Sequence, residues 1–206
     1  MKQEINENTE NKILEAANSV FEKKGYDGTK MQEIADTAGI NKALLHYYFR
    51  SKDKLFEMIF SMAFRKLVGR LEFLFDENIP VIEKIKIFID QHTDFIAANR
   101  HLPLFIVNEV NRRPEIFVKL LSGIYEKDDR LLRLLAQIDK ETKEGVLKPF
   151  DPRHVFLNMI AMNIFPFAAK PLVKGLLRMS EDEFRQFITE RKRIVTEVII
   201  NSIAAK

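Results

Sequence analysis

The chain has 206 residues, enough for one large domain or for a small domain followed by a larger one. Hydrophobic residues make up 46% and charged residues 31%, a balance that excludes wholesale disorder and an integral membrane protein. Cysteine is absent, which excludes disulfides, thiolate metal sites and cysteine nucleophiles. Because an apolar leader and a long apolar run are also absent, we expect a cytoplasmic protein without membrane contact.

Positive charge is concentrated in one short segment. Residues 1–56 carry nine Lys and Arg against nine Asp and Glu, so this part as a whole is neutral. Residues 41–54 hold four cations and one acid, Asp53, which leaves a local net charge of +3. The same segment contains His46, Tyr47 and Tyr48. A basic and aromatic surface is typical of nucleic-acid binding, and an ordinary solvated helix face is the alternative.

Helix patterns fill the first quarter of the chain, and no period-two strand pattern is found anywhere. Apolar residues at helical spacing predict a helix over about Thr9–Lys24. Thr29 and Gln32 have the spacing of a capping box that opens a short second helix, which ends at Gly39. Asn41 is the expected cap of a third helix of about two turns. The pattern predicts an all-α fold that begins with three helices.

Two short helices joined by a tight turn after a longer helix have the layout of a helix-turn-helix, whose second short helix enters the DNA major groove. If Leu45 is buried, the advance of ~100° per residue places Ala43 and Tyr47 on the opposite face, flanked by Leu44 and His46. Hydroxyls and cations from this helix and the residues after it can then reach phosphate oxygens, as can the amino-terminus of the second helix.

Residues 9–56, TENKILEAANSVFEKKGYDGTKMQEIADTAGINKALLHYYFRSKDKLF, resemble the DNA-binding headpiece of the tetracycline-repressor-like (TetR) family of bacterial transcriptional regulators. The patterns ILEAAxxVFxxKGY, TxMxxIAxxAGI and LxYYFxSKxxLF occur in order and at family spacing. The resemblance implies phosphate contacts by Thr29, Tyr47, Tyr48 and Lys52, base contacts by Lys42, Ala43 and Leu44, and core positions for Leu45 and Phe49.

Three positions depart from the family pattern. The family commonly has a glycine, a small residue or threonine, and a tyrosine where this chain has Ala43, Leu44 and His46. An apolar Leu44 suits the methyl group of thymine, which only the major groove presents. We expect His46 to be partly buried or to face phosphate.

Longer helices follow the headpiece. Ser51 is the expected cap of a helix over about 52–75, which would connect the headpiece to the rest of the chain. Further helices are predicted from Pro80 to Asn99, from Leu102 to Arg113, from Pro114 to near Gly145, after a cap at Asp151, and after a capping box at Ser180. Nine or ten helices result. We expect a DNA-binding domain over 1–51 and a helical effector-binding and dimerisation domain over 52–206.

Polar side chains interrupt the Phe-rich apolar stretches of the larger domain. A buried polar group needs a partner, which in a pocket can be a ligand; satisfied hydrogen bonds within the core are the alternative. The expected ligand-binding residues are Phe64, Phe88, His92, Phe95, Phe105, Asn108, Met162, Asn163 and Phe165.

Two helices near the carboxyl end have apolar faces wider than one core contact requires. The segment HVFLNMIAMNIFPF is apolar on nearly every side, and the last helix carries a wide apolar stripe, which predicts half of a four-helix dimer bundle. The resemblance agrees, since the family dimerises through its last two helices. The expected interface residues are Phe156, Met159, Ile160, Phe187, Ile194, Val195, Val198 and Ile199.

The resemblance implies a dimeric regulator, expected to be a repressor, that binds palindromic operator DNA. A small apolar or amphipathic effector would enter the Phe-rich domain, shift residues 52–75 and release the DNA. A DNA-binding protein of the same fold controlled by a protein partner is the alternative, and an all-helical enzyme is a remote third. No Gly-rich phosphate loop, nucleophile elbow or HExxH motif is present, so we expect no enzyme, cofactor or metal site.

Overall fold

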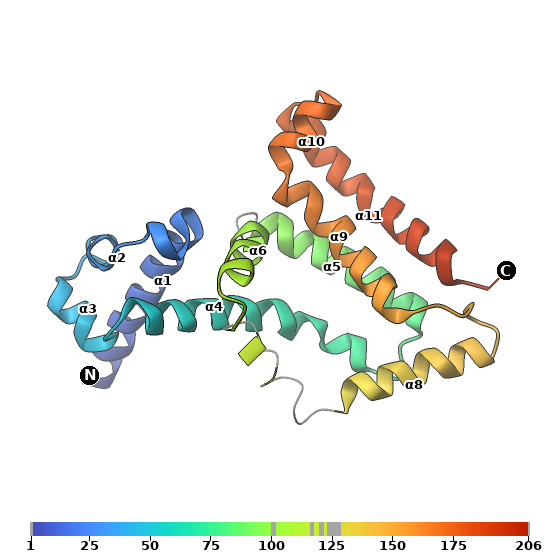
Figure 1. Ribbon diagram of the computed structural model, residues 1–206, viewed down its shortest axis with the longest axis horizontal. Helices are drawn as coiled ribbons and strands as arrows, with labels where there is room; N and C mark the ends of the chain where they lie inside the picture. The colour runs from blue at the N-terminus through green and yellow to red at the C-terminus, as the bar shows by residue number, and fades with distance from the viewer. Residues whose placement is uncertain (1, 100–101, 116–117, 120–121, 123–128, 206) are drawn as a thin grey trace. The chain divides into compact units, whose positions relative to one another are not determined.

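The structure is a computed structural model that describes residues 2–99, 102–115, 118–119, 122 and 129–205 (Figure 1). These residues form ten α-helices and one 3-10 helix, with no strand beyond a single bridge between Leu147 and Ala204. The predicted all-α class is confirmed. The chain divides into two compact units: unit 1 comprises Met1–Val68 and Leu104–Ile124, and unit 2 comprises Gly69–Pro103 and Tyr125–Lys206. The functional boundary expected after residue 51 stays a prediction.

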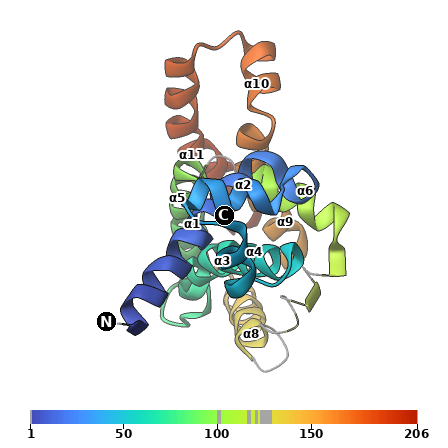
Figure 2. The same cartoon turned by 90° about the vertical axis from the view of Figure 1, so that its left-hand side faces the viewer.

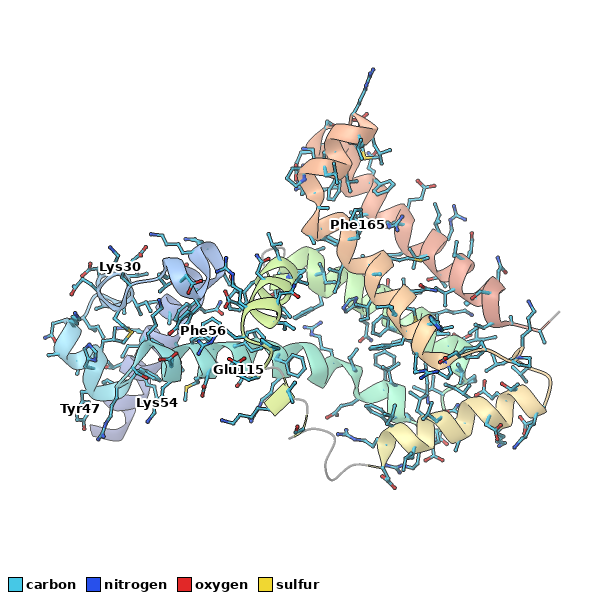
Figure 3. All side chains as sticks on the ribbon, viewed as in Figure 1. Lys30, Tyr47, Lys54, Phe56, Glu115 and Phe165 are labelled. Carbon is cyan, nitrogen blue, oxygen red and sulfur yellow. The ribbon has the colours of Figure 1, made fainter. Side chains whose placement is uncertain are left out.

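Aromatic side chains form the core of unit 1. Its helices are α1 (Lys2–Gly28), α2 (Met31–Ala38), α3 (Lys42–Tyr48), α4 (Lys52–Val68) and, from Leu104 onward, α6 (Leu102–Arg112). Phe56 of α4 is fully buried (Figure 3), with its ring centroid 5.1 Å from that of Phe21 on α1 and 5.9 Å from that of Phe105 on α6. These ring contacts join α1, α4 and α6.

The ends of the first helices differ in part from the sequence prediction. The helix α1 begins at Lys2, earlier than expected, and continues past a kink at Gly25, whose φ of 66° is in the left-handed region. The predicted capping box is wrong, because the Thr29 hydroxyl donates to the Gly25 carbonyl at 2.7 Å and Gln32 donates to Asp36. A backbone carbonyl freed by the kink therefore takes the hydroxyl that was expected to cap α2.

Two other expectations for this region concern α3 and α4. The Asn41 cap is confirmed, since its side chain accepts a hydrogen bond from the Leu44 amide at 2.8 Å. The Ser51 cap is also confirmed, by a 3.2 Å bond from the Lys54 amide. The helix expected over 52–75 is α-helical only to Val68, and the 3-10 helix η1 (Gly69–Phe75) replaces its last two turns.

Unit 2 is built around three helices. They are α5 (Val81–Ala98), α9 (Pro152–Ala168) and α11 (Glu181–Ile203), which pack against one another (Figure 1). The helix α8 (Arg130–Lys143) packs against η1 and α5. The core consists of Val81, Ile85, Phe88, Ile89, Leu147, Met159, Val195, Ile199 and Ile203.

Long-range and local caps both fix the helices of unit 2. The caps predicted at Asp151 and Ser180 are confirmed, the latter as a complete capping box with Glu183. The start of α5 has no side-chain cap of its own, and the carboxylate of Glu141 on α8 accepts the Val81 amide hydrogen bond at 3.1 Å instead. The single helix predicted from Pro114 to near Gly145 is wrong over the described residues, because α8 begins at Arg130; residues 116–117, 120–121 and 123–128 of that prediction lie outside them.

A short helix that the sequence prediction missed follows α9. It is α10 (Lys170–Leu177), and Figure 2 shows it and the first turns of α11 as two arms joined at one end. Val173 of α10 packs against Phe184 and Ile188 of α11 in a small separate core. Among the described residues no single helix is long and apolar enough to cross a membrane; only α9 and α10 taken together, bent by 79° at their junction, pass that test on length and composition.

Candidate nucleic-acid interface

One face of α3 is buried and the other is open to solvent. Leu45 and Phe49 are buried in unit 1, as expected. Lys42, Ala43, Leu44, His46 and Tyr47 are exposed. Tyr47 is 75% exposed, and its side chain points away from the helices of unit 1 (Figure 3). The helix therefore presents two apolar side chains, one imidazole, one phenol and one ammonium group on a surface about two turns long.

The start of α2 provides backbone donors in the same helix-turn-helix. Lys30 occupies the N-cap position and is exposed, and no side chain caps the first-turn amides. Free amides and the positive end of the helix dipole favour a phosphate group at this point. Thr29, which was expected to contact phosphate, is only 2% exposed, and its hydroxyl donates to Gly25. Lys30 was missed as a candidate, although its place directly before the second helix pattern was visible in the sequence.

Aromatic and basic side chains surround the carboxyl end of α3. The Tyr47 and Tyr48 rings meet edge to face, with centroids 5.5 Å apart, and Tyr48 is half-buried. Arg50 and Lys54 are exposed and form no ion pair in the described part of the chain. The Lys52 ammonium lies 4.2 Å from the centroid of the Tyr26 ring. The local excess of positive charge therefore lies at the surface beside α3.

The acid in this basic segment is neutralised by residues of other helices. Asp53 Oδ1 accepts a 2.7 Å hydrogen bond from the Tyr26 hydroxyl and a 3.0 Å bond from Arg113, the residue that follows α6. The Tyr26 hydrogen bond and then the Arg113 bond hold the pKa of Asp53 below its ordinary value, and the Asp53 carboxylate raises the pKa of Tyr26. Nothing in the sequence pattern indicated Tyr26 or Arg113, because their contacts with Asp53 are long-range.

The expected ligand-binding residues are divided between the two units. Phe64 and Phe105 belong to unit 1, whereas Phe88, His92, Phe95, Met162 and Asn163 belong to unit 2. The side chains of Asn108 and Phe165 are exposed. Figure 3 labels Phe165, which is 57% exposed near the end of α9. Unit 2 also has a shallow groove of about 370 Å³ between α5 and α11, lined by charged side chains and by none of the predicted ligand residues.

A buried polar pair lies in the apolar core of unit 2. His92 of α5 is 5% exposed, its ring stacks on Phe88 with centroids 4.8 Å apart, and its Nδ1 lies 3.3 Å from Nδ2 of Asn163 on α9. Since the amide nitrogen can only donate, His92 Nδ1 accepts and the imidazole is neutral. Burial lowers the pKa of His92 to about 4. No cluster of His, Asp and Glu fit to hold a metal ion is present among the described residues.

The expected interface residues differ in exposure. Phe156, Ile194 and Val198 are 47%, 40% and 48% exposed, whereas Ile160 and Phe187 are half-buried. Met159, Val195 and Ile199 lie in the core of unit 2, so their side chains face the chain's own helices. Leu157 on α9 is 61% exposed and was not among the expected residues. The exposed members give α9 and α11 an apolar surface that their own unit does not cover.

Comparisons with known proteins agree with this geometry. The sequence profile described as bacterial regulatory proteins, tetR family, matches residues 13–59. The HTH-type transcriptional regulator RutR of Escherichia coli is 28% identical over 193 residues, which cover 91% of this chain and 88% of that protein. The icaADBC biofilm operon negative transcriptional regulator IcaR of Staphylococcus epidermidis is 25% identical, covering 73% and 77%. A solved TetR family transcription regulator from Marinobacter aquaeolei shares the fold, with a TM-score of 0.67, 18% identity and full coverage of both chains.

Proposed function

This chain belongs to the TetR family of bacterial transcriptional regulators, and from that premise we propose that it is a homodimeric repressor that binds palindromic operator DNA and is released by a small effector. Like these relatives, it is a DNA-binding regulator and not an enzyme. The observation that carries the proposal is the exposed face of α3, with Tyr47 at its centre, above the buried Leu45 and Phe49.

The exposed residues of the headpiece divide into two kinds of contact. Lys42, Ala43 and Leu44, in the first turn of α3, approach base edges, and Leu44 contacts a thymine methyl group. Phosphate contacts come from Tyr47, Tyr48 and Lys52 together with the free amides at the start of α2. His46 lies beside them and faces the same groove. Because the Thr29 hydroxyl is occupied by the Gly25 carbonyl, we assign Thr29 to holding the α1–α2 turn.

Dimerisation would bring two recognition helices to one operator. Phe156 and Leu157 of α9 and Ile194 and Val198 of α11 supply an exposed apolar surface on two helices that already pack together. Two such pairs related by a two-fold axis form a four-helix bundle, in which the same surface of each protomer meets its counterpart. A two-fold dimer presents its recognition helices to successive major grooves, so the operator is palindromic. Repression is the activity that the name of IcaR states for that relative.

We propose unit 2 for the effector site. The buried pair His92 and Asn163 has hydrogen-bonding capacity inside an apolar core, which suits a small apolar or amphipathic molecule with one polar group. To move the regulator from mostly bound to mostly released, the effector must prefer the released form by ~5 kcal/mol. Control by a protein partner is the alternative, supported by the exposed leucines of α8 and α10, of which Leu132 and Leu176 are 69% and 73% exposed.

The test is selection of DNA by the purified protein from a pool of genomic fragments, followed by affinity measurements over a salt series. We expect a palindrome to be enriched and log affinity to fall with log salt by about 0.9 for each neutralised phosphate. Tyr47→Ala should abolish enrichment, whereas Met62→Ala, which removes an exposed apolar side chain of α4, should preserve it. Equal enrichment by the wild type and Tyr47→Ala, or no enrichment at all, would contradict the proposal.

A further inference from the structure

The last turn of α6 reaches three residues of the headpiece that are distant in sequence. Glu109 Oε1 accepts a 3.1 Å hydrogen bond from the backbone amide of Tyr26, 83 residues away. Arg112 pairs with Asp27 at 2.9 Å, and Arg113 pairs with Asp53 at 3.0 Å. All of these residues belong to unit 1. A helix from the middle of the chain is thus fixed to the end of α1 and to the first turn of α4.

Tyr26 is at the centre of these contacts between the end of α6 and the headpiece, which we call the α6 joint. Its amide bonds to Glu109, its hydroxyl bonds to Asp53, and its ring lies 4.3 Å from the Arg113 guanidinium and 4.2 Å from the Lys52 ammonium. Figure 3 labels Lys54 and Phe56, which lie in the first turns of α4 together with Lys52 and Asp53. One tyrosine therefore links the charged end of α6 to the turn that carries the proposed phosphate contact Lys52.

The negative charge of Asp53 is the reason why its contacts with Tyr26 and Arg113 matter for DNA binding. Asp53 lies between Lys52 and Lys54, at the turn proposed to meet the DNA backbone, and it stays ionised because its partners lower its pKa. A free carboxylate there would repel phosphates and cancel one of the two neighbouring cations. Instead, its Oδ1 accepts from both Tyr26 and Arg113, and the guanidinium balances its charge.

We propose that Arg113 is a positioning residue for DNA binding: through Asp53 and Tyr26 it fixes the first turn of α4 and keeps the Asp53 carboxylate from acting against the phosphate contacts. The inference rests on the proposed DNA-binding role of this surface. Arg113 does not touch DNA itself. It acts on the operator from the end of a helix outside the helix-turn-helix, through a contact with a residue 60 positions away in the sequence.

Arg112 provides a matched control one residue away. It carries the same charge and is the last residue of α6, yet its partner is Asp27, and both side chains are well exposed, at 56% and 74%. Exposed pairs of this kind contribute little. Replacing Arg112 by Met therefore removes one positive charge from unit 1 and leaves Asp53 and Tyr26 in place.

The experiment measures the affinity for the selected operator duplex over a salt series, for the wild type, Arg113→Met and Arg112→Met. We expect Arg113→Met to bind at least about tenfold more weakly than Arg112→Met, as loss of a charge-assisted hydrogen bond predicts. Its salt slope should fall by about 0.9 for each protomer bound, since a released Asp53 cancels one cation. Adding Asp53→Asn to Arg113→Met should restore both the affinity and the slope.

Each outcome bears on the inference. Equal losses in Arg112→Met and Arg113→Met, or no recovery with Asp53→Asn, would overturn it, because the effect would then be general charge or folding. If the melting curve shows that Arg113→Met does not fold, Arg113→Gln, which removes the charge and keeps a polar side chain, replaces it in the same comparison. A wild-type protein that selects no DNA would instead contradict the proposed function, so the two failures are distinct.

Discussion

His92 makes the stability of unit 2 depend on pH. Burial lowers its pKa in the folded chain to about 4, from the ordinary 6.5 that it regains on unfolding. The folded pKa is the lower one, so the unfolded chain takes up a proton below pH 6.5 while the folded chain does not until about pH 4. Acidification therefore favours unfolding, and the contribution of neutral His92 is complete above pH 6.5.

The magnitude follows from the two pKa values. The gap between 6.5 and about 4 corresponds to about 3 kcal/mol at about 1.36 kcal/mol per pKa unit, lost in full only below pH 4. Between about pH 7.5 and about pH 5 the free energy of unfolding should fall by about 2 kcal/mol on account of His92. The added proton on Nδ1 would also face Nδ2 of Asn163, an atom that can only donate, so protonation removes the 3.3 Å hydrogen bond.

The assay is urea unfolding followed by circular dichroism at about pH 7.5 and about pH 5, at one protein concentration, for the wild type and His92→Gln. Other carboxylates and histidines titrate in both proteins, so the quantity of interest is the difference between their pH dependences. His154→Gln, at an exposed position on α9, is the control and should behave like the wild type. An equal loss of stability in the wild type and His92→Gln would refute the reasoning.

Three further predictions concern single positions. Gly25→Ala should lower the free energy of unfolding by about 1–3 kcal/mol in urea titrations, because φ is 66° there and a Cβ would lie 3.1 Å from Glu109 Oε1; unchanged stability would contradict this. Ser180→Ala should cost about 1 kcal/mol in the same titration through loss of the capping box, whereas Ser180→Asp should preserve the cap. Val198→Glu should convert dimers to monomers in sedimentation experiments, and an unchanged dimer would rule out the proposed interface.

Features that depend on contacts between residues close in the sequence were predictable. Asn41, Asp151 and Ser180 each bond to an amide two or three residues later, so the pattern alone identified all three caps. The buried stripe of α3, with Leu45 at its centre, followed from helical spacing for the same reason. The exposed face that carries the proposed DNA contacts follows once the buried face is known.

Features that depend on the folded chain were not predictable. Glu141 caps α5 from 60 residues away, and Glu109 bonds to the Tyr26 amide across 83 residues. The periodicity of a sequence does not indicate which residues so far apart will contact each other. The kink at Gly25 draws the Thr29 hydroxyl away from the expected capping box, which a local pattern cannot show. Hydrophobic character likewise did not reveal that Phe105 packs against Phe56 within unit 1.

Two atoms in the α6 joint have no hydrogen-bond partner among the residues that the structure describes, although they are shielded from solvent: Oε2 of Glu109 and Nη1 of Arg113. Each such group lowers stability by about 1–3 kcal/mol compared with a satisfied one, and apolar side chains of similar shape avoid that loss. Laboratory evolution for heat resistance alone should therefore change positions 109 and 113 together with their partners, because an apolar side chain at either position alone would leave the Tyr26 amide or Asp53 without its partner. The variants selected in this way should have higher thermal stability but regulate poorly. The end of α6 is therefore a place where stability and function oppose each other.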